Sequence, residues 1–345
     1  MDWEPVSTLA DCLEVSSEPI GCFRYFSSAV ASDESRRAFA NNILTAYTTF
    51  NLDGIDLDWE YPGRQGAEGN NFDSKDTPNF LAFLTILRAS LPPTARISAA
   101  VQTSTFLDTQ AHPMTDLTDF ADLLDWVMLM NYDDWGCKHI FYSVCINMVN
   151  LSVQASSKPG PNAPLHDGCG NSTQPDANAV AGFQAWTAAH FPPCKLVLGL
   201  PSYGYISTSH AERLRTRSAF SSTSKRRPSD AIKVVDEDGG SDSQVQFRQL
   251  VRQGVLVRTT PQHGDGSPTF LSSGGFERRW DSCSATPFLR STSGQVITYD
   301  DPESLSMKAT FARQVGMLGV NLFDVHGDID EWDLTNSIRK SLDLD

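Results

Sequence analysis

Residues 53–63 read Asp53-Gly-Ile-Asp-Leu-Asp-Trp-Glu-Tyr-Pro-Gly63. Successive side chains of a β-strand face opposite sides, so Asp56, Asp58 and Glu60 share one face of a predicted strand. The apolar residues between them share the other face. If this strand belongs to an α/β barrel, the apolar face packs under the helices and the acids point into the barrel. Tyr-Pro-Gly ends the strand just after Glu60, which therefore lies at the C-terminal mouth, where barrel enzymes carry their catalytic groups.

Carboxylates placed this close together raise one another's pKa, so at least one of them is expected to hold a proton near neutral pH. Cleavage of a glycosidic bond needs such an acid at the leaving oxygen. A strand with a merely solvated acidic face is the plain alternative, but four acids in eight residues and the Pro-Gly ending argue against it. A regular strand cannot wrap its ligands around one ion, so no metal site is predicted.

Strands and helices alternate along the rest of the chain, which predicts a parallel α/β sheet or barrel. Short apolar runs predict strands, and apolar residues at helical spacing predict helices, with Ser32 or Asp33 capping the first of them. The predicted strands are Gly54–Trp59, Ile97–Gln102, Trp126–Tyr132, Lys195–Leu200 and Gly319–Val325. The predicted helices are Ser35–Phe50, Thr77–Leu91, Ala177–His190, Glu303–Gln314 and Asp333–Leu342.

The 345 residues suffice for one barrel of about 250 residues with an insertion. We expect the first part of a catalytic barrel in residues 1–205, an inserted α+β subdomain in 206–297, and the last strand and helices in 298–345. Ser207–Ser243 is rich in Ser, Arg, Asp and Gly and reads as loop or disorder. Lys138–Gln154 is an apolar piece for which the pattern indicates no structural purpose. An aromatic cluster in the insertion comprises Phe276, Trp280 and Phe288.

The charge balance limits the partners. Acids outnumber bases 42 to 27, giving a net charge of −15, which disfavours nucleic acid but not a neutral polysaccharide. No apolar run approaches the ~20 residues of a membrane span, and no signal peptide is visible at the N-terminus.

The seven cysteines form no CxxC pair, so scattered disulfides and buried thiols remain equally open, with at least one thiol unpaired in a monomer. Asn171-Ser-Thr and Asn150-Leu-Ser are glycosylation triplets of a kind common by chance.

The acidic segment resembles the signature of glycoside hydrolase family 18, Asp-x-x-Asp-x-Asp-x-Glu, and Asp53, Asp56, Asp58 and Glu60 fill every acidic position. The resemblance is to fungal-type chitinases and extends over about residues 23–342. It rests also on the segments Met128-Leu-Met-Asn-Tyr-Asp133, Leu198-Gly-Leu-Pro-Ser-Tyr203-Gly, Tyr299-Asp-Asp-Pro and Gly319-Val-Asn-Leu-Phe-Asp. It implies a (β/α)8 barrel, secretion from the cell, and a monomer if the barrel is complete.

The resemblance also implies a substrate-assisted, retaining cleavage of chitin or chito-oligosaccharides without cofactor or metal. Glu60 would protonate the glycosidic oxygen, Asp58 would orient the acetamido group, Asp56 would share a proton with Asp58, and Tyr132 would hydrogen-bond the acetamido group. Tyr132 read without the resemblance is an aromatic in a buried strand. The further substrate-binding residues implied are Asp53, Tyr61, Met128, Met130, Asp133, Trp135, Tyr203 and Phe323.

Aromatic rings are expected to stack on the sugars. Trp135, Tyr203 and Trp280 are candidates by position, and each could instead belong to the core. Phe323 stands where many chitinases have Trp at the floor of the −1 subsite. A phenyl ring covers less of the sugar and lacks the indole N–H, which bears on substrate affinity more than on chemistry.

The chain departs from the family's pattern at its start. The acidic motif lies on the fourth barrel strand in the family, yet only about 50 residues precede it here, where about 100 are needed for three units. We therefore expect five of eight strands and hypothesise an incomplete gene model, in which Lys138–Gln154 is untranslated sequence read through. Three alternatives to an endo-acting chitinase remain: a chitin-binding lectin, an endo-β-N-acetylglucosaminidase and an inactive truncated product.

Overall fold

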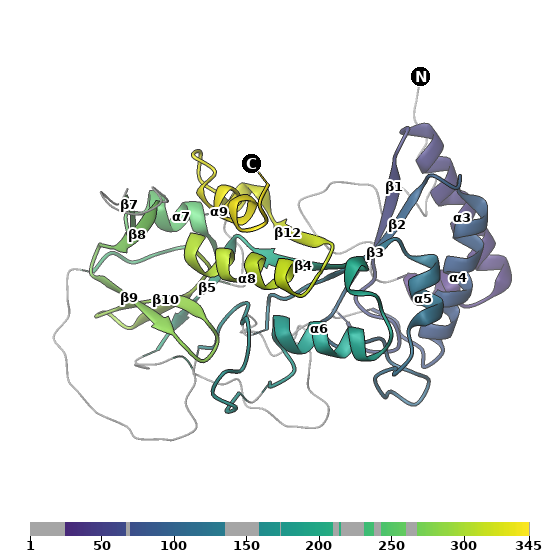
Figure 1. Ribbon diagram of the computed structural model, residues 1–345, viewed down its shortest axis with the longest axis horizontal. Helices are drawn as coiled ribbons and strands as arrows, with labels where there is room; N and C mark the ends of the chain where they lie inside the picture. The colour runs from purple at the N-terminus through teal and green to yellow at the C-terminus, as the bar shows by residue number, and fades with distance from the viewer. Residues whose placement is uncertain are drawn as a thin grey trace. The chain divides into compact units, whose positions relative to one another are not determined.

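The computed structural model describes residues 25–66, 70–134, 159–172, 174–209, 214, 231–237, 243–259 and 268–344. They fall into two compact units, the first holding residues 25–128 and 185–195 and the second the remainder. The helices in chain order (Figure 1) are α2 (Phe26–Val30), α3 (Asp33–Thr49), α4 (Asp76–Ser90), α5 (Thr118–Leu123), α6 (Ala179–Ala188), α7 (Phe247–Arg252), α8 (Pro302–Gln314) and α9 (Asp333–Ser341). The strands are β1 (Gly54–Asp58), β2 (Arg96–Val101), β3 (Trp126–Leu129), β4 (Leu196–Pro201), β5 (Tyr203–Thr208), β6 (Gln244–Gln246), β7 (Leu256–Thr259), β8 (Thr269–Ser272), β9 (Phe276–Asp281), β10 (Thr286–Ser291), β11 (Gln295–Thr298) and β12 (Gly319–Phe323).

In the first unit, β1 pairs in parallel with β2, and β3 follows β2 in the strand order. Trp59, one residue past β1, is 3% exposed and holds the strand against its helices. Its ring stacks on Phe26 of α2 at 5.3 Å between centroids and meets the edge of Phe80 of α4 at 5.5 Å. The apolar face of the acidic strand therefore packs under the helices, as the sequence predicts.

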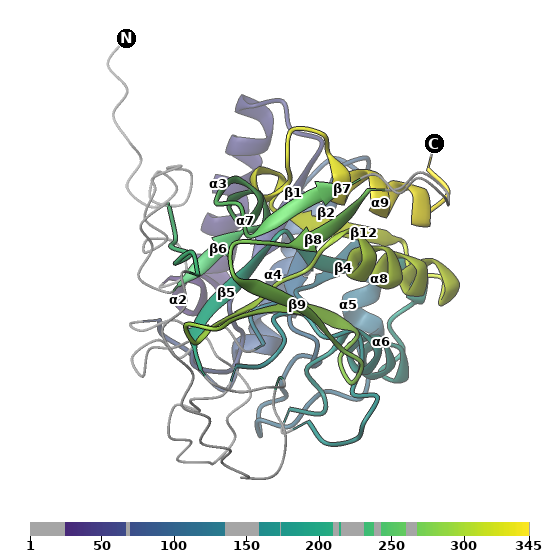
Figure 2. The same cartoon turned by 90° about the vertical axis from the view of Figure 1, so that its left-hand side faces the viewer.

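In the second unit, β4 and β12 pair in parallel, from Gly319 opposite Val197 to Phe323 opposite Pro201, and α8 packs on both strands. A five-stranded antiparallel sheet has the order β6-β5-β11-β10-β9, and β7 and β8 form a separate pair. Figure 2 labels β5, β6 and β9 of this sheet and both strands of the pair. Phe276 and Phe288, from the predicted aromatic cluster, are buried on β9 and β10.

The five predicted strands and five predicted helices are all present, with ends that shift by at most three residues. Ser32, not Asp33, caps α3: its hydroxyl accepts from the Ser35 amide and the Ser35 hydroxyl accepts in return. The prediction of loop from Ser207 was wrong at its start, because β5 runs through Thr208. Lys138–Gln154 lies outside the described residues, and the domain boundaries at 206 and 298 stay a prediction.

The second unit contains a disulfide between Cys169 and Cys283, whose Cα atoms are 5.1 Å apart across a sequence separation of 114 residues. Cys194 of the first unit is an exposed free thiol. Among the described residues the disulfide alternative thus occurs, whereas the free thiol there is exposed and not buried as the other alternative had it. The remaining cysteines lie outside them: Cys12, Cys22, Cys137 and Cys145. Within the part of the chain that is described, no helix is both long and apolar enough to cross a bilayer.

An ion pair lies in the core of the second unit. The ammonium of Lys308, on α8, is fully buried and donates to the equally buried carboxylate of Asp300, which also accepts from the Ser304 hydroxyl at 2.6 Å. Burial lowers the pKa of Lys308, and the charge of Asp300 opposes that shift. Removal of one partner would leave the other as an unpaired charge in the core.

We therefore expect Lys308→Ala to lower the free energy of unfolding by about 3–5 kcal/mol, measured by urea denaturation, because Asp300 loses its buried partner. Arg37→Ala is the control, since Arg37 pairs with Asp33 on the exposed surface of α3 and should change little. Equal losses in the two variants would contradict this account of the core.

Candidate active site

Asp56 and Asp58 lie on one face of β1, and both are exposed, whereas Leu57 between them is 4% exposed. The Ser98 hydroxyl, on the neighbouring strand β2, donates a hydrogen bond to the Asp56 carboxylate. Asp53 precedes the strand, and its main-chain carbonyl accepts from the Arg96 amide at 3.1 Å. The strand therefore presents a row of acids, and β2 fixes the orientation of one of them.

Asp58 has the most informative electrostatics of the row. Its side chain is reached by solvent, yet the surrounding protein displaces enough water that desolvation raises its pKa from 3.8 to about 6. The negative charge of Asp56 adds to the shift. Asp58 therefore binds and releases a proton near pH 6, well above the range of an ordinary surface aspartate.

Glu60 is half-buried and follows β1 by two residues. Its neighbour Tyr61 hydrogen-bonds the Glu60 side chain, and burial raises the Tyr61 pKa well above its ordinary value, with the Glu60 charge adding to the shift. Tyr61 thus stays a neutral donor. The structure makes Tyr61 a partner of Glu60, a relation that its predicted substrate-binding role did not include.

Two residues that the sequence analysis did not single out hold the Glu60 backbone. The side-chain Nδ2 of Asn70 donates to the main-chain carbonyl of Glu60 at 3.3 Å. Gly66 lies against the same carbonyl, and a Cβ at that position would come within 1.9 Å of the oxygen. Only glycine fits there, so the Gly/Asn-rich stretch after the acidic strand is the signal that could have identified this support.

In the second unit, an aromatic cluster forms around Tyr132, which lies past the end of β3. Its ring stacks on Phe323 with centroids 5.8 Å apart and planes 20° apart, and it meets Tyr203 at 6.1 Å. Phe323 is 50% exposed and offers an open ring face. Gly199 of β4 makes room for Tyr132, because a Cβ there would lie 2.9 Å from the tyrosine ring.

Asp133 is held by two phenols. The hydroxyls of Tyr203 and Tyr205 donate to its Oδ1 at 2.7 Å and 2.6 Å. Two alternatives were left open for Tyr203, a sugar-stacking platform and a core residue. Its ring is only 2% exposed and belongs to the core. Tyr205 was not predicted, although its place two residues after Tyr203 on a strand puts both on one face.

The other predicted residues lie as follows. Met128 and Met130 are half-buried, and they alternate with the buried Val127 and Leu129, so the two methionines share a face. Trp280 of β9 is half-buried, with the Arg278 guanidinium 5.6 Å from its ring centroid. Trp135 lies outside the described residues.

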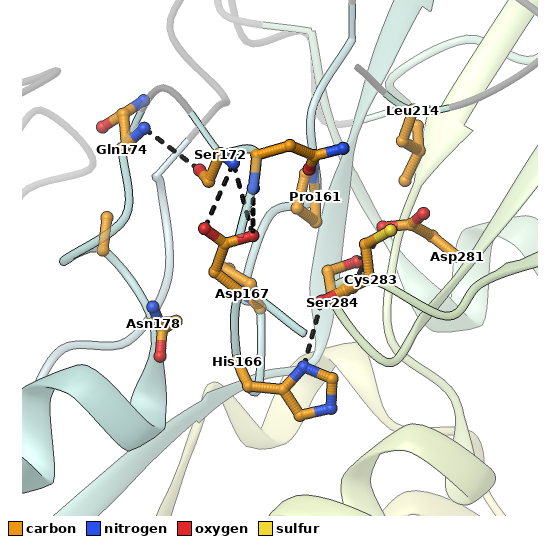
Figure 3. A pocket seen from close by; sticks show the side chains of 13 residues that line it. Pro161, His166, Asp167, Ser172, Gln174, Asn178, Leu214, Asp281, Cys283 and Ser284 are labelled. Carbon is orange, nitrogen blue, oxygen red and sulfur yellow. Dashed lines mark hydrogen bonds between the residues drawn. The ribbon is translucent and has the colours of Figure 1, made fainter. Parts of the chain in front are cut away.

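A separate small pocket in the second unit has a volume of about 40 Å³ (Figure 3). His166, Asp167 and Cys283 line it, and Asp167 accepts from the Ser172 amide at 3.1 Å. None of the predicted site residues lines it. Across the described ranges, no group of three or more His, Cys, Asp or Glu could hold a metal ion.

The sequence profile of glycosyl hydrolases family 18 matches residues 20–328. The chain belongs to this family. A chitinase-like effector of Moniliophthora roreri is 34% identical over 88% of this chain and 71% of its own length. Chitinase A1 of Niallia circulans is 26% identical over 92% of this chain, which spans only 40% of that protein. A crystal structure of a Rhizomucor miehei chitinase superposes with a TM-score of 0.71 at 27% identity, covering 92% of this chain and 81% of that one.

These similarities establish the fold class as a member of the TIM-barrel lineage, and the strand–helix pattern predicted from the sequence is confirmed. They also confirm the resemblance to chitinases on which the site residues were chosen. The individual roles of those residues remain proposals.

Asp58 gives a pH-dependent prediction. Because its pKa is raised in the folded protein, the folded state binds the proton more tightly than the unfolded chain, and stability falls as the pH rises from 3.8 to about 6. Asp58→Asn stays neutral, so it should raise the melting temperature near pH 7 and change it little below about pH 4. Scanning calorimetry measures this, with Asp122→Asn on α5 as the control. A gain that is the same at both pH values would refute the raised pKa.

Proposed function

We propose that this chain hydrolyses β-1,4-linked N-acetylglucosamine polymers by endo-action, with Glu60 as the general acid. The observation that carries the proposal is the arrangement of acids on and after β1. Asp56 and Asp58 share one face, and the pKa of Asp58 is raised. Glu60 follows them, and its carboxylate is hydrogen-bonded to Tyr61. The family includes chitinases. This chain carries the complete set of acids that the proposed hydrolysis needs.

The proposed reaction uses no carboxylate as nucleophile. Glu60 donates its proton to the glycosidic oxygen as the bond to the anomeric carbon breaks. The carbonyl oxygen of the substrate's own N-acetyl group bonds to that carbon, giving an oxazolinium ion. Water, deprotonated by Glu60, then opens the ring with overall retention. Asp58 orients the acetamido nitrogen and stabilises the charge that develops there, and Asp56 shares its proton.

The aromatic cluster of the second unit supports sugar binding. Its exposed Phe323 ring and the adjacent Tyr132 provide an apolar floor, and rings of this kind bury the apolar faces of sugars. We propose that Tyr132 and Asp133 bind the acetamido group and the distorted sugar. Supporting roles are proposed for Asp53, Met128, Met130 and Trp135. An extracellular site of action is proposed with this substrate.

A chitin-binding protein that does not cleave is the second candidate. The relative from Moniliophthora roreri is described as a chitinase-like effector, and Asp56 of this chain is open to solvent. Open carboxylates are weaker at stabilising charge than enclosed ones, because water screens them. The presence of Glu60 favours hydrolysis.

Glu60→Gln tests the proposal. The amide keeps the shape of the acid but has no proton to give, so hydrolysis of a fluorogenic N-acetylglucosamine oligomer should fall by about 100- to 10,000-fold. Glu34→Gln, at an exposed position of α3, is the matched control and should retain full activity. A folded wild-type chain that binds the oligomer without releasing product would favour the non-cleaving candidate.

Substrate chemistry gives a further prediction. Because the N-acetyl carbonyl acts as the nucleophile, a fully deacetylated glucosamine oligomer of equal length should not be cleaved. The acetylated oligomer should be cut at internal bonds and release its products first as β-anomers, which proton NMR and chromatography of early products detect. Cleavage of both oligomers at similar rates would rule out substrate assistance.

A further inference from the structure

A buried loop lies beside the aromatic cluster of the second unit, and the mechanism proposed above does not use it. Residues 159–165 are all buried. Main-chain hydrogen bonds anchor the loop on two sides: the Leu165 amide donates to Ser284 at 2.9 Å, and the Ala179 amide donates to Pro164 at 3.1 Å. Asn162, at the centre of this loop, is 2% exposed. The anchored loop therefore fixes the position of the Asn162 side chain relative to the residues that it hydrogen-bonds.

The side-chain amide of Asn162 hydrogen-bonds two residues at once, Asp133 of the proposed sugar site and Tyr203 of the core. Its Oδ1 accepts from the main-chain amide of Asp133 at 2.9 Å, and its Nδ2 donates to the main-chain carbonyl of Tyr203 at 3.0 Å. The Tyr203 hydroxyl in turn donates to Asp133 Oδ1 at 2.7 Å. Asn162, Asp133 and Tyr203 thus form a closed ring of three hydrogen bonds.

This ring supports a backbone that is otherwise unfavourable. Asp133 has a φ of +65°, in the left-handed region that residues other than glycine rarely adopt. The Asn162 Oδ1 bond holds the amide of Asp133 in that conformation. The same peptide unit follows Tyr132, whose ring stacks on Phe323, so a rotation at Asp133 would also move the aromatic floor.

We infer that Asn162 is a positioning residue, which orients Asp133 and, through the chain, Tyr132 for sugar binding by clamping the turn after β3 to the first residue of β5. The inference rests on the proposed function of Asp133 and Tyr132. It assigns to Asn162 no contact with the substrate. A displacement of about 1 Å in such a site can lower kcat/KM by about 100-fold, so the role is measurable.

The chain offers a closely matched control. Asn178 is 3% exposed, its Oδ1 accepts from the Ala181 amide at 2.9 Å, and its Nδ2 donates to the Pro175 carbonyl at 2.7 Å. Asn162→Ala and Asn178→Ala therefore remove the same group, the same burial and the same two kinds of hydrogen bond. Only the first change touches the ring that contains Asp133.

The experiment measures kcat and KM on a fluorogenic N-acetylglucosamine oligomer, and the affinity for chitotetraose in the Glu60→Gln background, at a temperature where both variants are folded. We expect Asn162→Ala to lower kcat/KM by about 10- to 100-fold and to weaken chitotetraose binding. Asn178→Ala should show equal loss of melting temperature and near wild-type kinetics. Equal kinetics in the two folded variants would overturn the inference while leaving the proposed function intact.

Asn162→Asp provides a second test if the alanine variant does not fold. A protonated carboxyl copies both hydrogen bonds of the amide, whereas a carboxylate loses the donor and faces Asp133, with Tyr203, Tyr205 and Asp134 as the other titratable groups nearby. Activity relative to wild type should therefore recover as the pH falls. A ratio that does not change with pH would overturn the inference. A wild-type chain that neither binds nor cleaves would overturn both the inference and the proposed function.

Discussion

The alternation of side chains along β1 is the constraint on which the catalytic proposal depends. Five residues of strand place Asp56 and Asp58 on one face, while Leu57 and, one residue past the strand, Trp59 are buried against the helices. The apolar side fixes the strand, so the acids cannot move apart to relieve their repulsion. Instead, the loss of water around Asp58 and the negative charge of Asp56 raise the pKa of Asp58. The apolar face of β1 thus stabilises the fold, and its acidic face carries the proposed catalytic groups.

The second unit holds a polar group, the Asp133 carboxylate, beside the aromatic rings of Tyr132 and Phe323. Asp133 lies in the turn after β3, in a backbone conformation that residues other than glycine rarely adopt, and hydrogen bonds from two tyrosine hydroxyls and to one buried asparagine hold it there. Preorganised hydrogen bonds of this kind cost little rearrangement when a ligand binds. The cluster is therefore suited to a ligand with both an apolar face and a polar substituent, which describes an N-acetylated sugar.

Periodicity in the sequence was sufficient to locate the parallel strands and their helices, because each buries an apolar face with a regular repeat. Alternation also predicted the shared face of Asp56 and Asp58 on β1, whereas Glu60 lies two residues past the strand and its role stays a prediction. Strands β5 to β11, which the sequence analysis did not predict, mix apolar residues with Gln, Arg, Ser and Thr, so they carry little periodic signal. The supports of the site were also missed: Gly66, Asn70, Tyr205 and Asn162 act through backbone approach or through residues distant in the chain. For Tyr203 the sequence left a sugar platform and a core ring open, and only the burial of the side chain decides for the core.

The disulfide between Cys169 and Cys283 has a consequence for the integrity of the protein. It joins the loop before α6 to the turn between β9 and β10, and the 114-residue separation encloses β4 and β5 and most of the antiparallel sheet. A protease cut anywhere between these two cysteines would open the main chain but leave the two fragments covalently connected. In surroundings rich in proteases, such a nicked molecule would keep its strands at high effective concentration and would separate only under reducing conditions.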